Sequence, residues 1–201
     1  MDRKKFLLSY SLLALSFSTF GSVVKKLDGN YVGDCETTND ILGPFYRPNA
    51  PLRTDLTFEG LTGNQLMIKG KVLGADCRTP LQGALVEIWH CDTQGEYDND
   101  SKAFRHRAGW KTNNQGEYAF KTIIPGKYLN GDLYRPSHIH FRVTHKSGRE
   151  LISQIYFNGD PHIPADPWAS QGKAKHRILN IYPDDVNSTL AINFDISLRN
   201  K

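Results

Sequence analysis

The stretch Leu133-Tyr-Arg-Pro-Ser-His-Ile-His-Phe-Arg-Val143 changes, after Ser137, into a regular alternation of apolar and polar residues. Residues two apart on a β-strand point to the same face of a sheet, so the alternation predicts a strand that covers a core with one face. His138 and His140 share the opposite face, where their ring nitrogens lie close enough to bind one ion. The apolar residues that face the core are Ile139, Phe141 and Val143.

Short segments of the same kind recur along the chain on both sides of this one. Leu66, Ile68 and Val72 alternate with lysines, and a late segment, residues 190–198, alternates without a break. Strands this frequent, separated by turns of Gly, Pro and Asn, predict an all-β fold, a β-sandwich of short, mostly antiparallel strands. The predicted strands are residues 66–72, 84–89, 117–123, 138–144, 151–157 and 190–198, and a short helix is predicted within residues 168–177.

The region ahead of these strands has a different character. Residues 28–39, which contain Gly and Asn, predict an irregular N-terminal arm. Three prolines lie between Leu42 and Pro51, and they exclude both a regular helix and a central strand there. This segment is therefore predicted to be extended and rigid.

The composition is that of an ordinary globular protein. A length of 201 residues suggests one domain, and 39% hydrophobic with 23% charged residues is typical of a soluble fold. The net charge is +4, but lysines and arginines are scattered along the chain. Since nucleic-acid-binding proteins usually carry a basic stripe, we expect no nucleic-acid partner.

The first residues have the pattern of a removed secretory signal. A basic segment, residues 2–5, precedes an apolar stretch, residues 6–20. Thr19 and Gly21 then supply the small residues that a signal peptidase reads. We therefore predict a signal peptide at residues 1–21.

This signal predicts a mature chain of one domain, residues 22–201, that is exported to the periplasm or secreted. The same reading predicts no stable membrane association after cleavage. The alternative is an uncleaved helix that tethers the protein to a membrane, although the apolar stretch is short of the about 20 residues that span a bilayer. Lys4 stands where a twin-arginine signal has its second arginine, so the sequence leaves the export route open.

Three cysteines allow one disulfide at most. Cys77 and Cys91 bracket a turn and a whole predicted strand, which would place them ~20 Å apart at about 3.3 Å per residue. A disulfide needs Cα atoms within about 7 Å. Either Cys35 pairs with one of the other two, or no cysteine pairs.

The pair His138 and His140 needs further ligands before it predicts a metal site. A cupin would supply a Glu four or five residues on, where this chain has Thr144 and His145. A site of two histidines and one carboxylate is also possible, but no carboxylate lies at a matching strand spacing. The remaining oxygen donors are tyrosines.

Two tyrosines each follow a turn at the end of a predicted strand, where side chains gather around a cleft. Tyr97 follows Gln94-Gly-Glu, and Tyr128 follows Pro125-Gly-Lys. Either tyrosine alone would more simply be a core or surface aromatic. Their role depends on the motifs in which they stand.

Four motifs together resemble the intradiol ring-cleavage dioxygenases, the family that includes catechol 1,2-dioxygenase and protocatechuate 3,4-dioxygenase. The resemblance runs from about Asn39 to Phe157, in the order that the family has them. The motifs are Val86-Glu-Ile-Trp-His-Cys-Asp-Thr-Gln-Gly-Glu-Tyr97, Gly116-Glu-Tyr-Ala-Phe-Lys-Thr-Ile-Ile-Pro-Gly-Lys-Tyr128, Tyr134-Arg-Pro-Ser-His-Ile-His-Phe141 and Leu151-Ile-Ser-Gln-Ile-Tyr-Phe157.

The resemblance implies a role for each matching position. It makes Arg135 the active-site arginine and Gln154 the glutamine behind the metal ligands. Phe45 and Pro48, in a segment similar to one wall of the family's substrate pocket, are the implied substrate contacts. The implied ligands of one non-haem Fe(III) per chain are Tyr97, Tyr128, His138 and His140.

The implied activity is cleavage of a catechol-type ring between its two hydroxylated carbons, with O2, to give a muconate-type diacid. Two tyrosinates and a hydroxide would balance the three charges of Fe(III), and a trivalent ion can hold a phenolate whose free pKa is about 10. The implied partners are a small catechol and O2, with a homo-oligomer possible and no organic cofactor. The rival hypothesis is a non-catalytic, transthyretin-like β-sandwich module. The ring substituents stay open, since Asn130 stands where protocatechuate 3,4-dioxygenase has a tryptophan.

Overall fold

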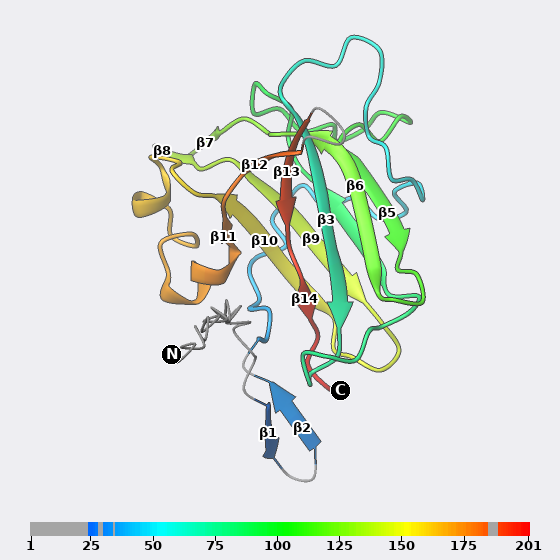
Figure 1. Ribbon diagram of the computed structural model, residues 1–201. Helices are drawn as coiled ribbons and strands as arrows, with labels where there is room; N and C mark the ends of the chain where they lie inside the picture. The colour runs from blue at the N-terminus through cyan, green and yellow to red at the C-terminus, as the bar shows by residue number, and fades with distance from the viewer. Residues whose placement is uncertain (1–23, 28–29, 34, 185–188) are drawn as a thin grey trace, which may run out of the picture.

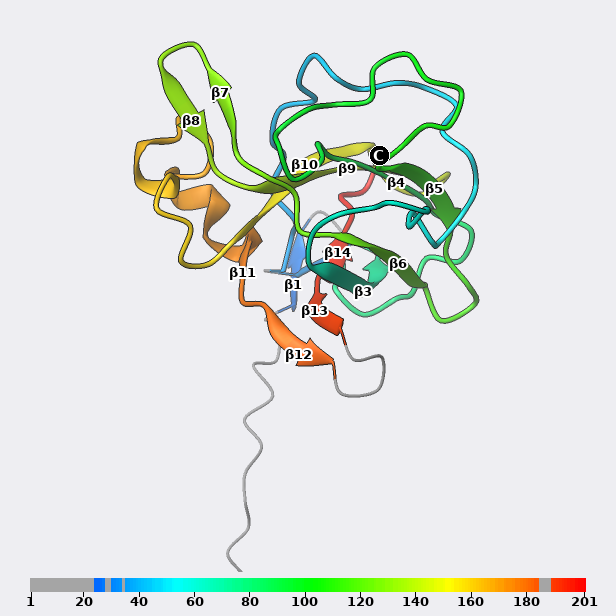
Figure 2. The same ribbon diagram turned by 90° about the horizontal axis from the view of Figure 1, so that it is seen from above.

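Two β-sheets pack face to face in the computed structural model of the chain (Figure 1). The structure describes residues 24–27, 30–33, 35–184 and 189–201. Seen from above, the two sheets form separate layers with loops gathered at one end (Figure 2). The predicted all-β sandwich is therefore confirmed, and the predicted signal peptide at residues 1–21 lies outside the described residues.

The first sheet carries the predicted histidine strand at its centre. Its pairs are antiparallel except for that between the two strands at one edge, β10 and β11. In spatial order its strands are β11 (Ile178–Leu179), β10 (Leu151–Phe157), β9 (His138–Thr144), β4 (Leu85–Trp89) and β5 (Arg107–Lys111).

The second sheet is mixed and is built around its longest strand, β3 (Gln65–Leu73). β3 pairs antiparallel with β6 on one side and parallel with β13 and β14 on the other. Its remaining strands are β6 (Glu117–Ile123), β12 (Tyr182–Asp184), β13 (Thr189–Asn193) and β14 (Ile196–Ser197).

The unbroken strand predicted at residues 190–198 is wrong in one respect, since it divides into β13 and β14. The Asp195 carboxylate accepts the backbone N–H of Lys71 at 2.8 Å, so a side chain takes the place of a ladder carbonyl at this point. Tyr118 also donates its hydroxyl to the carbonyl of Phe194 at 2.6 Å. Side-chain hydrogen bonds of this kind compete with sheet pairing and are not visible in an apolar–polar alternation.

The core lies between the sheets and contains the residues that the alternation placed there. On β9, Ile139, Phe141 and Val143 are fully buried, as predicted. The facing strand β3 contributes Leu66, Ile68 and Val72, also fully buried. Because these residues use one face of each sheet, the other face of β9 is free to carry a site.

Three segments differ from the sequence-based expectations. The predicted irregular arm is wrong in part, because β2 (Asn30–Gly33) pairs antiparallel with β1 (Val24–Leu27); Asp-Gly, the dipeptide between them, favours hairpin loops. Only the second half of the predicted helix at residues 168–177 is helical, as a 3₁₀ helix, η2 (Gly172–Arg177). A second short 3₁₀ helix, η1 (Ile163–Ala165), precedes it.

A small hairpin that the sequence did not predict projects beside the first sheet (Figure 2). It consists of β7 (Tyr128–Asn130) and β8 (Leu133–Arg135), which pair antiparallel. Three-residue strands are too short to show an alternation. The hairpin matters because a predicted ligand, Tyr128, begins it and Arg135 ends it.

One disulfide ties the N-terminal segment to the sandwich. Cys35 and Cys77 are bonded, with Cα atoms 5.9 Å apart, while Cys91 is free and buried. Of the pairings that the sequence left open, the structure forms the one that leaves Cys91 single.

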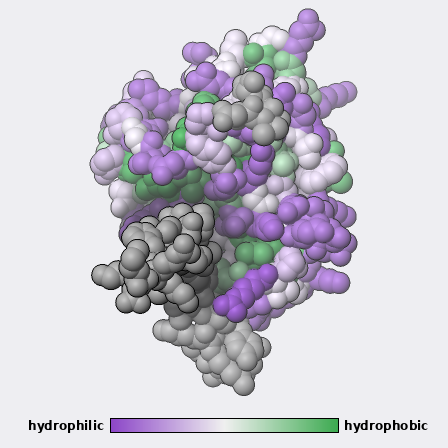
Figure 3. Space-filling view, viewed as in Figure 1, coloured by the Kyte–Doolittle hydropathy of each residue, from purple (hydrophilic) through white to green (hydrophobic). Residues whose placement is uncertain are grey.

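The surface is mostly hydrophilic on the side shown in Figure 3, where hydrophobic residues appear only in small patches. Over the described ranges, no helix is both long and apolar enough to cross a bilayer.

Candidate metal centre

The pairing of β9 with its neighbours builds the floor of the site. Across the sheet, His140 lies opposite Trp89 of β4 and Gln154 of β10, and His138 lies opposite Tyr156. Residues directly opposite in an antiparallel pair share a face. The face of the sheet that does not meet the core therefore carries two histidines, a glutamine, a tyrosine and a tryptophan, all buried.

Two glycine turns bring the tyrosines over this floor. A Cβ on Gly126 would lie 2.4 Å from the carbonyl oxygen of Thr93, and one on Gly95 would lie 2.6 Å from the carbonyl oxygen of Lys127. Only glycine allows these turns to touch, and Gly95 also has a positive φ of 89°. The contact of the two turns places the rings of Tyr97 and Tyr128 with centroids 5.8 Å apart.

The four predicted ligands come together in one cluster. The Tyr97 hydroxyl lies 3.5 Å from Nε2 of His138, and the rings of His138 and His140 have centroids 5.0 Å apart. Tyr128 lies 5.5 Å from His138 by the same measure. Residues from three separate segments of the sequence thus meet at one point.

Both histidines are in the state that a metal requires. Burial lowers the pKa of His138 to about 3 and that of His140 well below its ordinary value, so both rings are neutral near pH 7. Nδ1 of His138 donates to the carbonyl of Pro136 at 2.7 Å, which leaves the lone pair on Nε2, toward Tyr97. A metal-binding histidine commonly fixes its other nitrogen in this way.

His140 is held by packing instead of hydrogen bonds. Its ring stacks on the indole of Trp89, with centroids 4.8 Å apart and planes at 9°. Its Nδ1 is buried and without a hydrogen-bond partner. A buried, unpaired polar nitrogen is unfavourable, which indicates that this ring has a use beyond packing.

The tyrosines remain phenols unless a cation is present. Burial raises the pKa of Tyr97 well above its ordinary value. Burial also raises the pKa of Tyr128, although the charge and a hydrogen bond of Arg135 oppose the rise. Phenolates in this cluster therefore need a strongly charged ion to stabilise them.

The donor set fits a trivalent ion. In the part of the chain that the structure describes, no three His, Cys, Asp or Glu side chains gather in an arrangement that could hold a metal. Any ion at this cluster must therefore draw on phenolate oxygens in addition to the two imidazole nitrogens. A trivalent ion lowers the pKa of a bound phenol more than a divalent ion does, so a set with two phenolates suits Fe(III).

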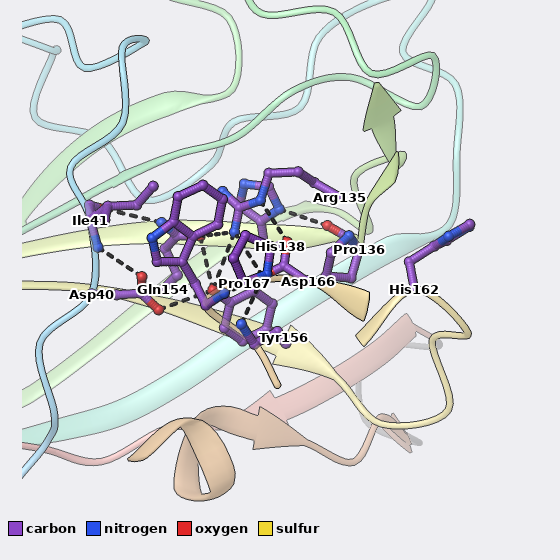
Figure 4. Close-up of polar contacts among 12 residues, drawn as sticks. Asp40, Ile41, Arg135, Pro136, His138, Gln154, Tyr156, His162, Asp166 and Pro167 are labelled. Carbon is purple, nitrogen blue, oxygen red and sulfur yellow. Dashed lines mark hydrogen bonds and ion pairs between the residues drawn. The ribbon is translucent and has the colours of Figure 1, made fainter. Parts of the chain in front are cut away.

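Arg135 is buried beside the cluster and makes several polar contacts there (Figure 4). Its Nε donates to Oδ2 of Asp166 at 2.9 Å, and its Nη2 donates to Oε1 of Gln154 at 3.1 Å. The guanidinium also lies 4.3 Å from the ring centroid of Trp168. Burial alone would lower the pKa of Arg135, but the hydrogen bond and charge of Asp166 raise it above its ordinary value.

A second ion pair completes the network around Gln154. The amide nitrogen of Gln154 donates to the carbonyl of Ile41 at 3.0 Å. The hydroxyl of Tyr156 accepts from Arg135 at 3.3 Å and donates to Asp40 at 3.0 Å. Asp40 in turn forms an ion pair with Arg177 at 2.5 Å. The network therefore has an ion pair at each end, Arg135–Asp166 at one and Asp40–Arg177 at the other.

The predicted pocket residues differ in position. Phe45 stacks on Tyr97, with centroids 4.2 Å apart, and meets the edge of Tyr128. Pro48 is exposed. Gly43, which was not predicted, lies against His140, because a Cβ there would come within 3.1 Å of the imidazole.

Sequence reasoning missed Asp166, Trp168 and the pair Asp40–Arg177. Tyr156 could have been predicted from the sequence, since it lies two residues after Gln154 on the same face of β10. Asp166, Trp168 and Asp40 come from loops and Arg177 ends the short helix η2, where no periodicity marks a side chain that points inward.

Comparisons with known proteins agree with this geometry. A sequence model of a family described as "Dioxygenase" matches residues 41–200. Catechol 1,2-dioxygenase 2 of Acinetobacter lwoffii is 33% identical over 147 residues, which cover 63% of this chain and 53% of that protein. The protocatechuate 3,4-dioxygenase beta chain of Burkholderia cepacia is 30% identical over 192 residues, covering 83% of this chain and 80% of the relative.

Among solved structures, the dioxygenase domain of a dioxygenase–carbohydrate-binding protein fusion from Streptomyces sp. SirexAA-E is similar with a TM-score of 0.72 at 29% identity. The likeness covers 83% of this chain and 99% of that domain. The chain spans about half the length of several curated relatives, which it covers to 53%, 50% and 49%. The family match over most of its length identifies the chain as a member of the intradiol ring-cleavage dioxygenases.

Proposed function

We propose that the protein is a non-haem Fe(III) dioxygenase that cleaves a catechol-type ring between its two hydroxylated carbons and incorporates both atoms of O2. The observation that carries the proposal is the cluster of Tyr97, Tyr128, His138 and His140, with both histidines neutral. Tyr97, Tyr128, His138 and His140 would hold the ion. When bound, Fe(III) would withdraw electron density from a coordinated catecholate and so make the ring reactive toward O2.

The tyrosines and Arg135 supply the remaining chemistry. A catechol must lose two protons on binding, and Tyr128 and the hydroxide that balances the charge of the ion would each accept one. Tyr97, whose ring stacks on Phe45, would remain a ligand of the ion. Arg135 would then stabilise negative charge that develops on the ring.

The product distinguishes this proposal from its rivals. Two histidines with one carboxylate hold Fe(II), and such sites generally cleave beside the diol, whereas a site with two tyrosinates is expected to cleave within it. We expect catechol to yield cis,cis-muconate containing both atoms of ¹⁸O2, as measured by absorbance and product mass. Accumulation of the yellow semialdehyde would exclude the tyrosine ligands, and a folded protein without iron or O2 uptake would favour the transthyretin-like module.

We also propose that the protein is exported. The basic and apolar segments at residues 2–20 support this, and so does the Cys35–Cys77 disulfide, because disulfides persist mainly in oxidising compartments. N-terminal sequencing of the protein from a host that exports it is expected to find a mature chain that starts near Ser22. A start at Met1 in active, soluble protein would contradict cleavage.

A further inference from the structure

Asp166 forms a buried ion pair with Arg135. Asp166 lies just after η1, in a loop that none of the family motifs quoted above includes. The side chains of Arg135 and Asp166 are 3% and 1% exposed, and Nε lies 2.9 Å from Oδ2. A buried charge pair of this kind keeps a single geometry, since water cannot replace either partner.

The loop fixes the carboxylate independently of the arginine. Oδ1 of Asp166 accepts the backbone N–H groups of Trp168 at 3.0 Å and Ala169 at 2.7 Å. The orientation of the carboxylate is therefore set by its own backbone. The indole of Trp168, from the same loop, packs on the guanidinium at 4.3 Å. Asp166 can therefore fix the position of Arg135, while its own orientation is set by the backbone of its loop.

The guanidinium also contacts two residues of the sheet that carries the histidines. Nε donates to Asp166, and Nη2 donates to Gln154 at 3.1 Å and to Tyr156 at 3.3 Å. In Figure 4 the carboxylate of Asp166, the amide of Gln154 and the hydroxyl of Tyr156 surround the arginine.

We infer that Asp166 is a positioning residue that fixes the guanidinium of Arg135 beside the metal centre and affects turnover only through Arg135. The inference rests on the proposed function. It extends the catalytic apparatus to residues 163–171, which contribute the carboxylate that accepts from Nε and the indole that packs on the guanidinium.

A double-mutant cycle tests the inference on the full-length, iron-loaded protein. The variants are Asp166→Asn, Arg135→Gln and the combination of both, because the amide of Asn keeps the shape of the loop residue without its charge. The control is Asp184→Asn, which removes a carboxylate from an ion pair of similar length, 2.8 Å to Lys69, on the second sheet. Each protein is assayed for iron content, visible absorption, anaerobic catechol binding and turnover of catechol.

We expect Asp166→Asn to keep its iron and its absorption, and to bind catechol within about threefold of the wild type. Its kcat is expected to fall by about 10- to 100-fold, the range found when a partner behind a catalytic group is removed. In the Arg135→Gln background the same substitution should change kcat by less than about twofold, since coupled residues are not additive. The control is expected to keep the wild-type kcat.

Two results would overturn the inference while leaving the proposed function intact. One is a wild-type kcat in Asp166→Asn, and the other is a full, additive loss in the Arg135→Gln background. A wild-type protein that holds iron but cleaves no catechol would instead overturn the proposed function itself. Asp166→Glu is the second variant in case Asp166→Asn does not fold: it keeps the charge but displaces it by one methylene, and a wild-type kcat there would also contradict positioning.

Discussion

Replacing His140 by alanine is expected to remove most of the iron and to lower turnover of catechol by about 10³-fold. The purified wild-type protein should be coloured and hold about one iron per chain, because tyrosinate donates charge into Fe(III). A metal that stabilises a transition state contributes several kcal/mol, and about 1.4 kcal/mol corresponds to a factor of ten in rate. His140 makes no hydrogen bond that a structural role would require, since its Nδ1 is unpaired and its ring stacks on Trp89.

His106→Ala is the matched control for this substitution. His106 is 4% exposed and His140 is 1% exposed, and Nδ1 of each is buried without a partner. The control should keep its iron and its colour. Equal iron loss in both variants would mean that a cavity, and not a lost ligand, releases the metal. A colourless, active protein that contains zinc would exclude the assignment of Fe(III) to this cluster.

Arg135→Ala is expected to lower turnover by about 10²-fold or more, the scale found when one contact to a transition-state charge is lost. The structure predicts a second effect, on stability. The carboxylate of Asp166 would be left buried without its partner, which destabilises a protein by about 3–5 kcal/mol. Urea unfolding and steady-state kinetics therefore both need to be measured.

The double variant Arg135→Leu/Asp166→Asn separates the two effects. It removes both charges, so the free energy of unfolding should return toward the wild-type value while the turnover of catechol stays low. Recovery of turnover together with stability would show that Arg135 acts only in folding. Normal turnover in Arg135→Ala would remove it from the mechanism.

The floor of the site was predictable because it obeys the period of a strand. His138 and His140 follow from the same alternation that buries Ile139 and Phe141, and the structure bears this out. The tyrosines had no such period. They were found from their motifs, and the reason they meet lies in the glycine turns, where Gly95 and Gly126 let two loops touch.

The residues that orient Arg135 could not be predicted in this way. Asp166 is 31 positions from Arg135, and Asp40 is 137 positions from Arg177, so neither pair has a local spacing. Loop side chains turn inward according to backbone hydrogen bonds, such as those that Trp168 and Ala169 give to Asp166. These contacts exist only once the sheets have packed.

The disulfide has a consequence for the wall of the site. The segment that begins at Cys35 also supplies Asp40, the Ile41 carbonyl and Phe45, which contact Arg177, Gln154 and Tyr97. Cross-linking Cys35 to Cys77, 42 residues away, removes chain entropy from the open state, by about 4 kcal/mol for a loop of this length. The disulfide thus keeps this segment close to the sheet and favours its docking. A protein oxidised before it binds iron would have the segment in place beside Tyr97 and Gln154. In a protein made in a reducing host, the segment would dock less completely.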